Sequence, residues 1–217
     1  MRYWTALDCG QAHDYSAALV MERTGDELHV TSLERAPLRT PYPKIAAAVV
    51  AKVCELEPVG AFGERNDIGL IIDAGGVGRA VRDLVKEELR RRGASAPRVH
   101  FWPVAATGGG RVSIGGGFIN VPKRDLVMAA VVALQDGRLK IGDVPNADLL
   151  TKELAEYRMK LTARGHDTYE GSGRNDDLVY ACCLGAWAWS FTREEQHERN
   201  RSQDPFVESL RRNGHAI

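Results

Sequence analysis

Aspartates stand at the ends of three apolar segments of this 217-residue chain, where a charged side chain is unusual. Asp8 follows an apolar run near the start of the chain, and Asp73 ends a second run. Asp176 and Asp177 directly precede the third. A buried ionised carboxylate is costly unless it is paired, hydrogen-bonded or bound to a metal. These aspartates therefore either bind something or weaken the fold.

Two strand ends and a helix start can meet at one edge of a sheet, which would bring the aspartates together. Asn175 is a typical N-cap residue, so we expect Asp176 and Asp177 in a first helical turn, where the helix dipole favours charged carboxylates. Clustered carboxylates need a cation to offset their repulsion, and Mg²⁺ and Mn²⁺ prefer oxygen ligands. The sequence therefore predicts a divalent-metal site formed by Asp8, Asp73 and the neighbouring pair Asp176 and Asp177.

Two ions held about 4 Å apart by carboxylates can hydrolyse a phosphodiester bond. One ion activates water and the other stabilises the leaving 3′ oxygen, so no side-chain nucleophile is needed. Asp8 is expected to bridge both ions because its strand would be central, while Asp73 and Asp177 hold one ion each. Lys123 is a candidate phosphate contact, although a lysine ahead of an amphipathic helix is also an ordinary capping or surface residue.

Each aspartate also has an ordinary structural explanation. Asp8 can cap a turn, and Asp73 can end its strand by accepting hydrogen bonds from local backbone amides. Asp176 and Asp177 can be plain residues of a helix N-terminus. The metal site explains all of them at once, whereas these explanations must coincide three times. Asp14 lies in a polar turn near Asp8, which makes it a candidate additional ligand or a support for one.

The pattern of apolar residues predicts an α/β fold. We expect strands over residues 3–9, 16–23, 28–35, 68–73, 98–104 and 138–141, and helices over 44–56, 77–92, 123–135 and 147–157. The first three strands are expected to be antiparallel, and the later alternation of strands and helices is typical of parallel crossover units. Helices would then flank a mixed central sheet. We expect one domain over residues 1–191 and a polar, flexible C-terminal tail over 192–217.

Two segments keep open interpretations. Six basic residues follow one expected helix, and they form either a solvated face or a phosphate-binding surface: Arg79, Arg82, Lys86, Arg90, Arg91 and Arg92. Six glycines surround Arg111 between residues 107 and 118. That segment lacks the Lys-Ser or Lys-Thr of a phosphate-binding P-loop, so we interpret it as a flexible hairpin or loop and not as a nucleotide site.

Composition excludes several other classes of protein. Lys and Arg together number 29, and Asp and Glu together also number 29. The formal net charge of zero therefore argues neither for nor against nucleic-acid binding. The four cysteines lack zinc-site spacing, and we interpret them as reduced thiols of an intracellular protein. No stretch approaches the roughly 20 apolar residues that span a bilayer. No histidine has a Cys or Ser partner in a recognisable triad motif.

The order of these motifs resembles the nuclease domain of tailed-phage terminase large subunits. The segments that carry the resemblance are Leu7-Asp8-Cys9-Gly10-Gln11 with Asp14 and Ser16, Ile72-Asp73-Ala74-Gly75-Gly76-Val77-Gly78, Val121-Pro122-Lys123 and Asn175-Asp176-Asp177-Leu178-Val179-Tyr180-Ala181. Together they span most of residues 1 to about 191. The family often has His in place of Asn175 and Thr in place of Gly75, and neither difference removes a carboxylate.

The resemblance implies an RNase H-like fold and a divalent-metal-dependent endonuclease that cuts double-stranded viral DNA during genome packaging. It places the family's metal ligands on Asp8, Asp73 and Asp177, with Asp176 assisting, and two Mg²⁺ or Mn²⁺ ions as cofactors. Family members have a hairpin near DNA in the region of Arg111, so Arg111 joins Lys123 as a possible DNA contact.

The resemblance also implies partners and a location. A terminase ATPase domain, a small terminase subunit and a portal are expected partners, with the host cell cytoplasm of a bacteriophage or prophage as the location. This chain has no Gly-x-x-x-x-Gly-Lys-Ser/Thr motif, so we expect no ATPase activity from it. Two alternatives stay open: another RNase H-like nuclease of the resolvase type, and a catalytically silent module for DNA binding or packaging assembly.

Overall fold

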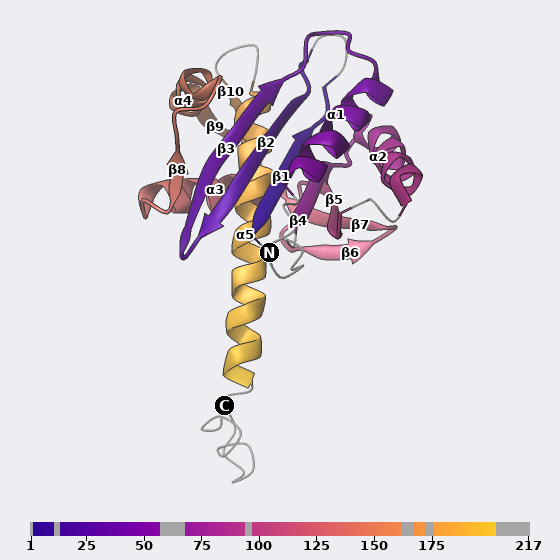
Figure 1. The fold of residues 1–217 in the computed structure, drawn as a ribbon. Helices are drawn as coiled ribbons and strands as arrows, with labels where there is room; N and C mark the ends of the chain where they lie inside the picture. The colour runs from indigo at the N-terminus through magenta and orange to yellow at the C-terminus, as the bar shows by residue number, and fades with distance from the viewer. Residues whose placement is uncertain are drawn as a thin grey trace.

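The computed structural model describes residues 2–10, 14–56, 68–93, 97–161, 167–171 and 176–202. Within these ranges an eight-stranded mixed sheet, in the order β6-β7-β5-β4-β1-β2-β3-β8, carries helices on both faces (Figure 1). Its strands are β1 (Tyr3–Asp8), β2 (Ala17–Thr24), β3 (Glu27–Arg35), β4 (Ile68–Asp73), β5 (Val99–Thr107), β6 (Ser113–Gly115), β7 (Phe118–Pro122) and β8 (Leu139–Ile141). The helices are α1 (Tyr42–Glu55), α2 (Gly78–Arg92), α3 (Lys123–Gln135), α4 (Ala147–Glu156) and α5 (Asp177–Ser202).

The strand pairing agrees with the sequence prediction. β1 pairs with β2, and β2 with β3, in antiparallel fashion. β1 then pairs in parallel with β4, and α2 connects β4 to its parallel neighbour β5. The predicted α/β fold, with three antiparallel strands, later parallel strands and flanking helices, is confirmed.

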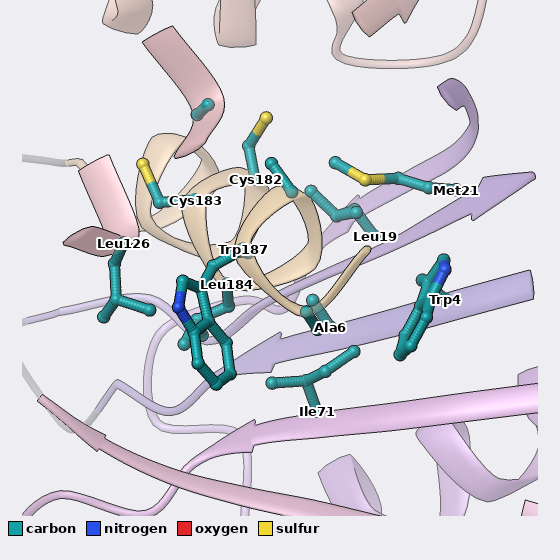
Figure 2. Packing of buried hydrophobic residues seen from close by; sticks show 14 of the residues in the cluster. Trp4, Ala6, Leu19, Met21, Ile71, Leu126, Cys182, Cys183, Leu184 and Trp187 are labelled. Atoms are coloured by element: carbon teal, nitrogen blue, oxygen red, sulfur yellow. The ribbon is translucent and has the colours of Figure 1, made fainter. Parts of the chain in front are cut away.

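The sheet separates two hydrophobic cores, because successive side chains of a strand point to opposite faces. On one face α5 packs over β1 and β2, and Figure 2 shows Ala6 and Met21 beside Cys182 and Leu184 of the helix. On the other face Leu7 packs with α1 and α2. The first half of α5 is apolar on nearly all sides, as expected for a helix buried within a core.

The glycine-rich segment, for which the sequence allowed a hairpin or a loop, is a hairpin. β6 and β7 pair in antiparallel fashion, and β7 also pairs in parallel with β5. The turn contains Gly116 and Gly117, whose φ angles of 61° and 78° lie in a region that favours glycine. The hairpin therefore extends the main sheet at its edge.

Two features of the fold were not expected from the sequence: an additional pair of strands and the length of the last helix. The strands β9 (Tyr157–Leu161) and β10 (Asp167–Gly171) form a separate antiparallel pair. α5 continues to Ser202, so the expected boundary between domain and tail at residue 191 falls inside a helix. The polar residues after 192 include good helix formers, and a helix nucleated by its buried half extends through them at little cost. Residues 203–217 lie outside the described residues.

The cysteines and the long helices bear on two of the expectations from composition. All four cysteines lie within the described ranges and are free thiols, as the sequence predicts. Across the helices that the structure describes, none is long and apolar enough to cross a membrane.

Gly69 of β4 lies opposite Trp4 of β1 and leaves room for its indole ring. A Cβ on Gly69 would lie 2.2 Å from Cε3 of Trp4, whose ring packs edge-to-face on Trp102 at 5.8 Å. We expect Gly69→Ala to lower the free energy of unfolding by about 1–3 kcal/mol, the usual cost of overpacking a core. Urea denaturation measures this change. Gly108→Ala is the control, because a Cβ there meets no atom within 4 Å, and equal midpoints for the two variants would contradict the account.

Candidate functional site

Parallel pairing of β1 with β4 brings two of the predicted aspartates to one edge of the sheet. Leu7 and Ile72 are partners, so the residues that follow them, Asp8 and Asp73, end at the same level. On the other side of β1, Asp8 is paired with Ala17 of β2, and Ala17 with Arg35 of β3. Asp73, Asp8, Ala17 and Arg35 therefore form a row across four neighbouring strands.

The row faces α5. The residues two positions earlier in β1, β4 and β3 all belong to the core that contains this helix: Ala6, Ile71 and Leu33. Side chains two apart in a strand share a face, which puts Asp8, Asp73 and Arg35 on the α5 side. Figure 1 shows α5 beginning at the end of the sheet where β3 ends.

The start of α5 brings the remaining aspartates to this edge. The helix begins at Asp177, in agreement with its predicted place in the first turn. Asp176 lies one position earlier than predicted: its carbonyl accepts the first helical hydrogen bond, from the Tyr180 amide at 2.8 Å, which makes Asp176 the N-cap residue. Asn175, the predicted N-cap, lies outside the described residues.

The charges of these aspartates act on one another. Burial raises the pKa of Asp8 well above its usual range, and the charges of Asp73, Asp177 and Asp176 raise it further. Burial also raises the pKa of Asp73, while a hydrogen bond from the Gly75 amide at 2.9 Å opposes the shift. The aspartates therefore form a single electrostatic group in which Asp8 is the least stable as an anion.

Asp177 has a positive neighbour that the sequence did not indicate. Burial raises the pKa of Asp177 to about 6, the charge of Arg35 opposes this shift, and the charge of Glu153 adds to it. The Arg35 guanidinium donates to Glu153 and lies 3.3 Å from Oδ2 of Asp177. Glu153 lies three residues after the buried Leu150 of α4, so both residues lie on the same face of that helix. This spacing was the sequence signal that could have identified Glu153 as a buried acidic residue.

The aspartates interact electrostatically, but their side chains are not arranged as a closed set of metal ligands. Among the described residues, no three His, Cys, Asp or Glu side chains are grouped so that they could hold a metal ion. The chemistry of the donors nevertheless suits a hard divalent cation, because every donor is a carboxylate oxygen and Oδ2 of Asp177 is buried without a hydrogen-bond partner.

Lys123 lies beside the aspartates. It follows β7 and starts α3, and β7, β5 and β4 run parallel, so Lys123 reaches the edge where Asp73 ends its strand. Its Nζ lies 5.6 Å from the centroid of the Tyr180 ring, and its charge lowers the pKa of Asp73. Burial and the charges of Asp73 and Asp8 raise the pKa of Tyr180 above its usual range. Lys123 is thus a second cation of this edge.

The other predicted contacts are exposed. Asp14 lies in the segment between β1 and β2, and Arg111 lies just ahead of β6. Both side chains are open to solvent, unlike Asp8, Asp73 and Asp177.

The basic helix α2 divides into two halves. Arg90 and Arg91 form ion pairs with Glu87 and Glu88 at 2.5 and 2.7 Å, so the far half is a self-neutralised solvated face. In the half nearest Asp73, Arg79 and Arg82 lie over the ring of Phe118 in β7, 4.9 and 4.7 Å from its centroid. Arg82 also forms an ion pair with Asp83 at 2.8 Å, which leaves Arg79 as the less neutralised of the two. Gly78 lets the start of α2 pack closely against the end of β4, because a Cβ there would lie 1.7 Å from the Asp73 carbonyl oxygen.

Comparison with solved structures shows the same fold in terminase nucleases. The large terminase nuclease of thermophilic phage G20c with bound magnesium has a TM-score of 0.55 and 22% identity, and the match covers 85% of this chain and 80% of that one. A manganese-soaked, inhibitor-bound terminase nuclease domain of human cytomegalovirus has a TM-score of 0.53 and 10% identity, with 86% and 80% covered.

A longer protein shares the fold as well. The large terminase of another thermophilic bacteriophage has a TM-score of 0.56 and 12% identity, and the match covers 84% of this chain but 38% of the longer one. No curated protein sequence matches this chain. The sequence model of the terminase RNase H-like domain matches residues 5–186, and the chain therefore belongs to that family.

Proposed function

We propose that this protein is a divalent-metal-dependent endonuclease that cuts double-stranded DNA, as terminase large subunits do in viral genome packaging. The observation that carries the proposal is that Asp8 and Asp73 end neighbouring strands at one sheet edge, where the charge of Asp177, at the start of α5, acts on Asp8. Family membership supports the same activity. The resolvase type of nuclease is less favoured, since the sequence model of the terminase RNase H-like domain matches residues 5–186.

We propose Asp8, Asp73 and Asp177 as the ligands of two Mg²⁺ or Mn²⁺ ions, with Asp176 assisting. The bound magnesium and cobalt in two G20c nuclease structures support the use of a divalent metal. When bound, the ions supply Lewis-acid assistance to the attack of water and to the departure of the 3′ oxygen. Asp8, between Asp73 and Ala17 in the row, is the carboxylate best placed to be shared.

The cations of the edge would bind the DNA backbone. Lys123, held between Asp73 and the Tyr180 ring, is proposed to contact the phosphate beside the scissile bond. Arg79 and Arg82, held on Phe118, would contact the phosphates further along the duplex, with Arg111 as an exposed addition. Asp14 is proposed as an outer support of the metal site.

The biological setting follows from the family. We propose that the domain works in the host cell cytoplasm, beside a terminase ATPase domain, a small terminase subunit and a portal. The alternative, a catalytically silent packaging module, is less favoured because the carboxylates are all present.

The carboxylates should be needed for cleavage. We expect the wild-type protein to cut supercoiled plasmid with Mg²⁺ or Mn²⁺ and not with EDTA. Asp8→Asn, Asp73→Asn and Asp177→Asn should each lower the rate by at least about 100-fold, because each removes a ligand of the catalytic ions. Gel analysis of plasmid products measures this, with the exposed Asp143→Asn as control. Cleavage in EDTA, or full activity of folded Asp8→Asn, would refute the proposal.

Asp8→Asn should also stabilise the metal-free protein. Because the pKa of Asp8 is raised in the folded state, its carboxyl group contributes stability at low pH that is lost as the pH rises. Replacing the carboxyl group of Asp8 is expected to raise the free energy of unfolding at pH 7, because burial and the charges of Asp73, Asp177 and Asp176 all disfavour its anion.

Mg²⁺ or Mn²⁺ should stabilise the wild-type protein and have much less effect on Asp8→Asn. Thermal unfolding in EDTA, and then with each ion, measures both effects. A metal-free Asp8→Asn that is less stable than the wild-type protein would show that this carboxylate is a structural cap.

The two halves of α2 should differ in DNA binding. We expect Arg79→Gln to weaken binding to a duplex about two- to tenfold and to reduce the salt dependence by about one counterion, as for a lost phosphate contact. Arg91→Gln, on the self-neutralised half of the same helix, should leave binding unchanged. Fluorescence anisotropy at several salt concentrations makes the measurement, and equal effects of the two substitutions would exclude a special role for the half near Phe118.

A further inference from the structure

Arg35 occupies a fixed place in the row that carries the aspartates. It is the last residue of β3 and lies two strands from Asp8, about 10 Å away at the usual strand spacing. The residue between them, Ala17, is fully buried and small. The guanidinium can therefore extend over Ala17 toward the start of α5.

Three groups hold the guanidinium of Arg35. It donates to Glu153, lies 3.3 Å from Oδ2 of Asp177, and stacks over the ring of Tyr15 at 4.9 Å. The exposed fractions of the Arg35, Glu153 and Asp177 side chains are only 13%, 7% and 6%. An arginine bound on two sides and stacked on an aromatic ring has little freedom to turn away.

Glu153 connects this pair to the helix that carries Asp177. The backbone amides of Leu178 and Val179, in the first turn of α5, lower the pKa of its carboxyl group, against the larger opposite effect of burial. α4, which carries Glu153, is itself attached to β3 because Nδ2 of Asn146 donates to the Leu33 carbonyl at 3.1 Å. Arg35 and Glu153 together therefore fix the first turn of α5 against the end of β3.

Three buried polar atoms of this cluster have no hydrogen-bond partner. Nε of Arg35, Oε2 of Glu153 and Oδ2 of Asp177 are all buried without a hydrogen-bond partner. Oδ2 of Asp177 thus has an ion-pair contact with Arg35 but no hydrogen bond, and it retains the capacity to bind another cation.

We propose that Arg35 is a positioning residue of the nuclease centre, which acts with Glu153 to orient the Asp177 carboxylate toward the metal ions. The inference rests on the proposed nuclease function. Arg35 touches neither DNA nor the ions in this role. It removes the repulsion between Glu153 and Asp177 and holds one oxygen of Asp177 at a fixed place.

The test separates metal binding from turnover. In Arg35→Met the loss of a positive charge favours cation binding while Asp177 loses its orientation, so the dissociation constant for Mn²⁺ should stay within about threefold of wild type. Plasmid cleavage at saturating Mn²⁺ should fall about 100-fold, the usual effect of a misplaced catalytic group. Electron paramagnetic resonance of free Mn²⁺ gives the first quantity, and plasmid cleavage gives the second.

Two further variants keep the test independent of folding. Arg35→Met leaves Glu153 buried and unpaired, which is destabilising, so the double variant Arg35→Met with Glu153→Gln removes both charges and keeps an acceptor for the α5 amides. It should fold and show the same loss of turnover. Arg35→Lys keeps the positive charge but cannot contact Glu153 and Asp177 at the same time. Compared with Arg35→Met, it should recover only a small part of the wild-type cleavage rate. Arg2→Met, which breaks the exposed pair with Glu22, is the control.

Each outcome decides between the explanations. A folded double variant that cleaves at the wild-type rate overturns the role of Arg35. So does a parallel loss of Mn²⁺ affinity and rate that follows the loss of stability, because that pattern indicates a merely structural residue. If the wild-type protein neither binds Mn²⁺ nor cleaves, the nuclease function itself fails, and the role of Arg35 fails with it.

Discussion

Repulsion between carboxylates gathered at one sheet edge is the constraint on which the rest of this structure depends. Parallel pairing of β1 with β4 puts Asp8 and Asp73 at one level, and α5 adds Asp176 and Asp177. Burial makes each charge costlier and water less able to screen it. A fold that keeps such a group must supply positive charge from within or take it from solution.

The protein supplies part of that charge at each end of the row. Lys123 acts on Asp73, and Arg35 acts on Asp177. Asp8 lies between them, with Asp73 on one side and the uncharged Ala17 on the other, and its pKa is raised by all its acidic neighbours. The carboxylate that lacks a positive neighbour is therefore Asp8, in the middle of the row. A divalent ion bound there would reach the largest number of carboxylates.

Much of this arrangement was predictable from local sequence patterns. Asp8 and Asp73 end apolar strands, and a charged residue next to a regular apolar pattern can be recognised without a structure. The partnership of Arg35 with Glu153 was not predictable, because the two residues are 118 positions apart and each is ordinary in its own segment. The extension of α5 to Ser202 and the pair β9–β10 also depend on neighbouring structure more than on local composition.

Crystals soaked in Mn²⁺ and measured for anomalous scattering would test the central claim most directly. The account predicts two manganese peaks at the carboxyl edge of β1 and β4, about 4 Å apart, with Asp8 between them and Asp177 turned to share its carboxylate with Arg35. An edge without manganese at millimolar concentration, in crystals that hold manganese elsewhere, would contradict it. The aspartates would then be a structural feature of the fold, and the nuclease proposal would lose its chemical basis.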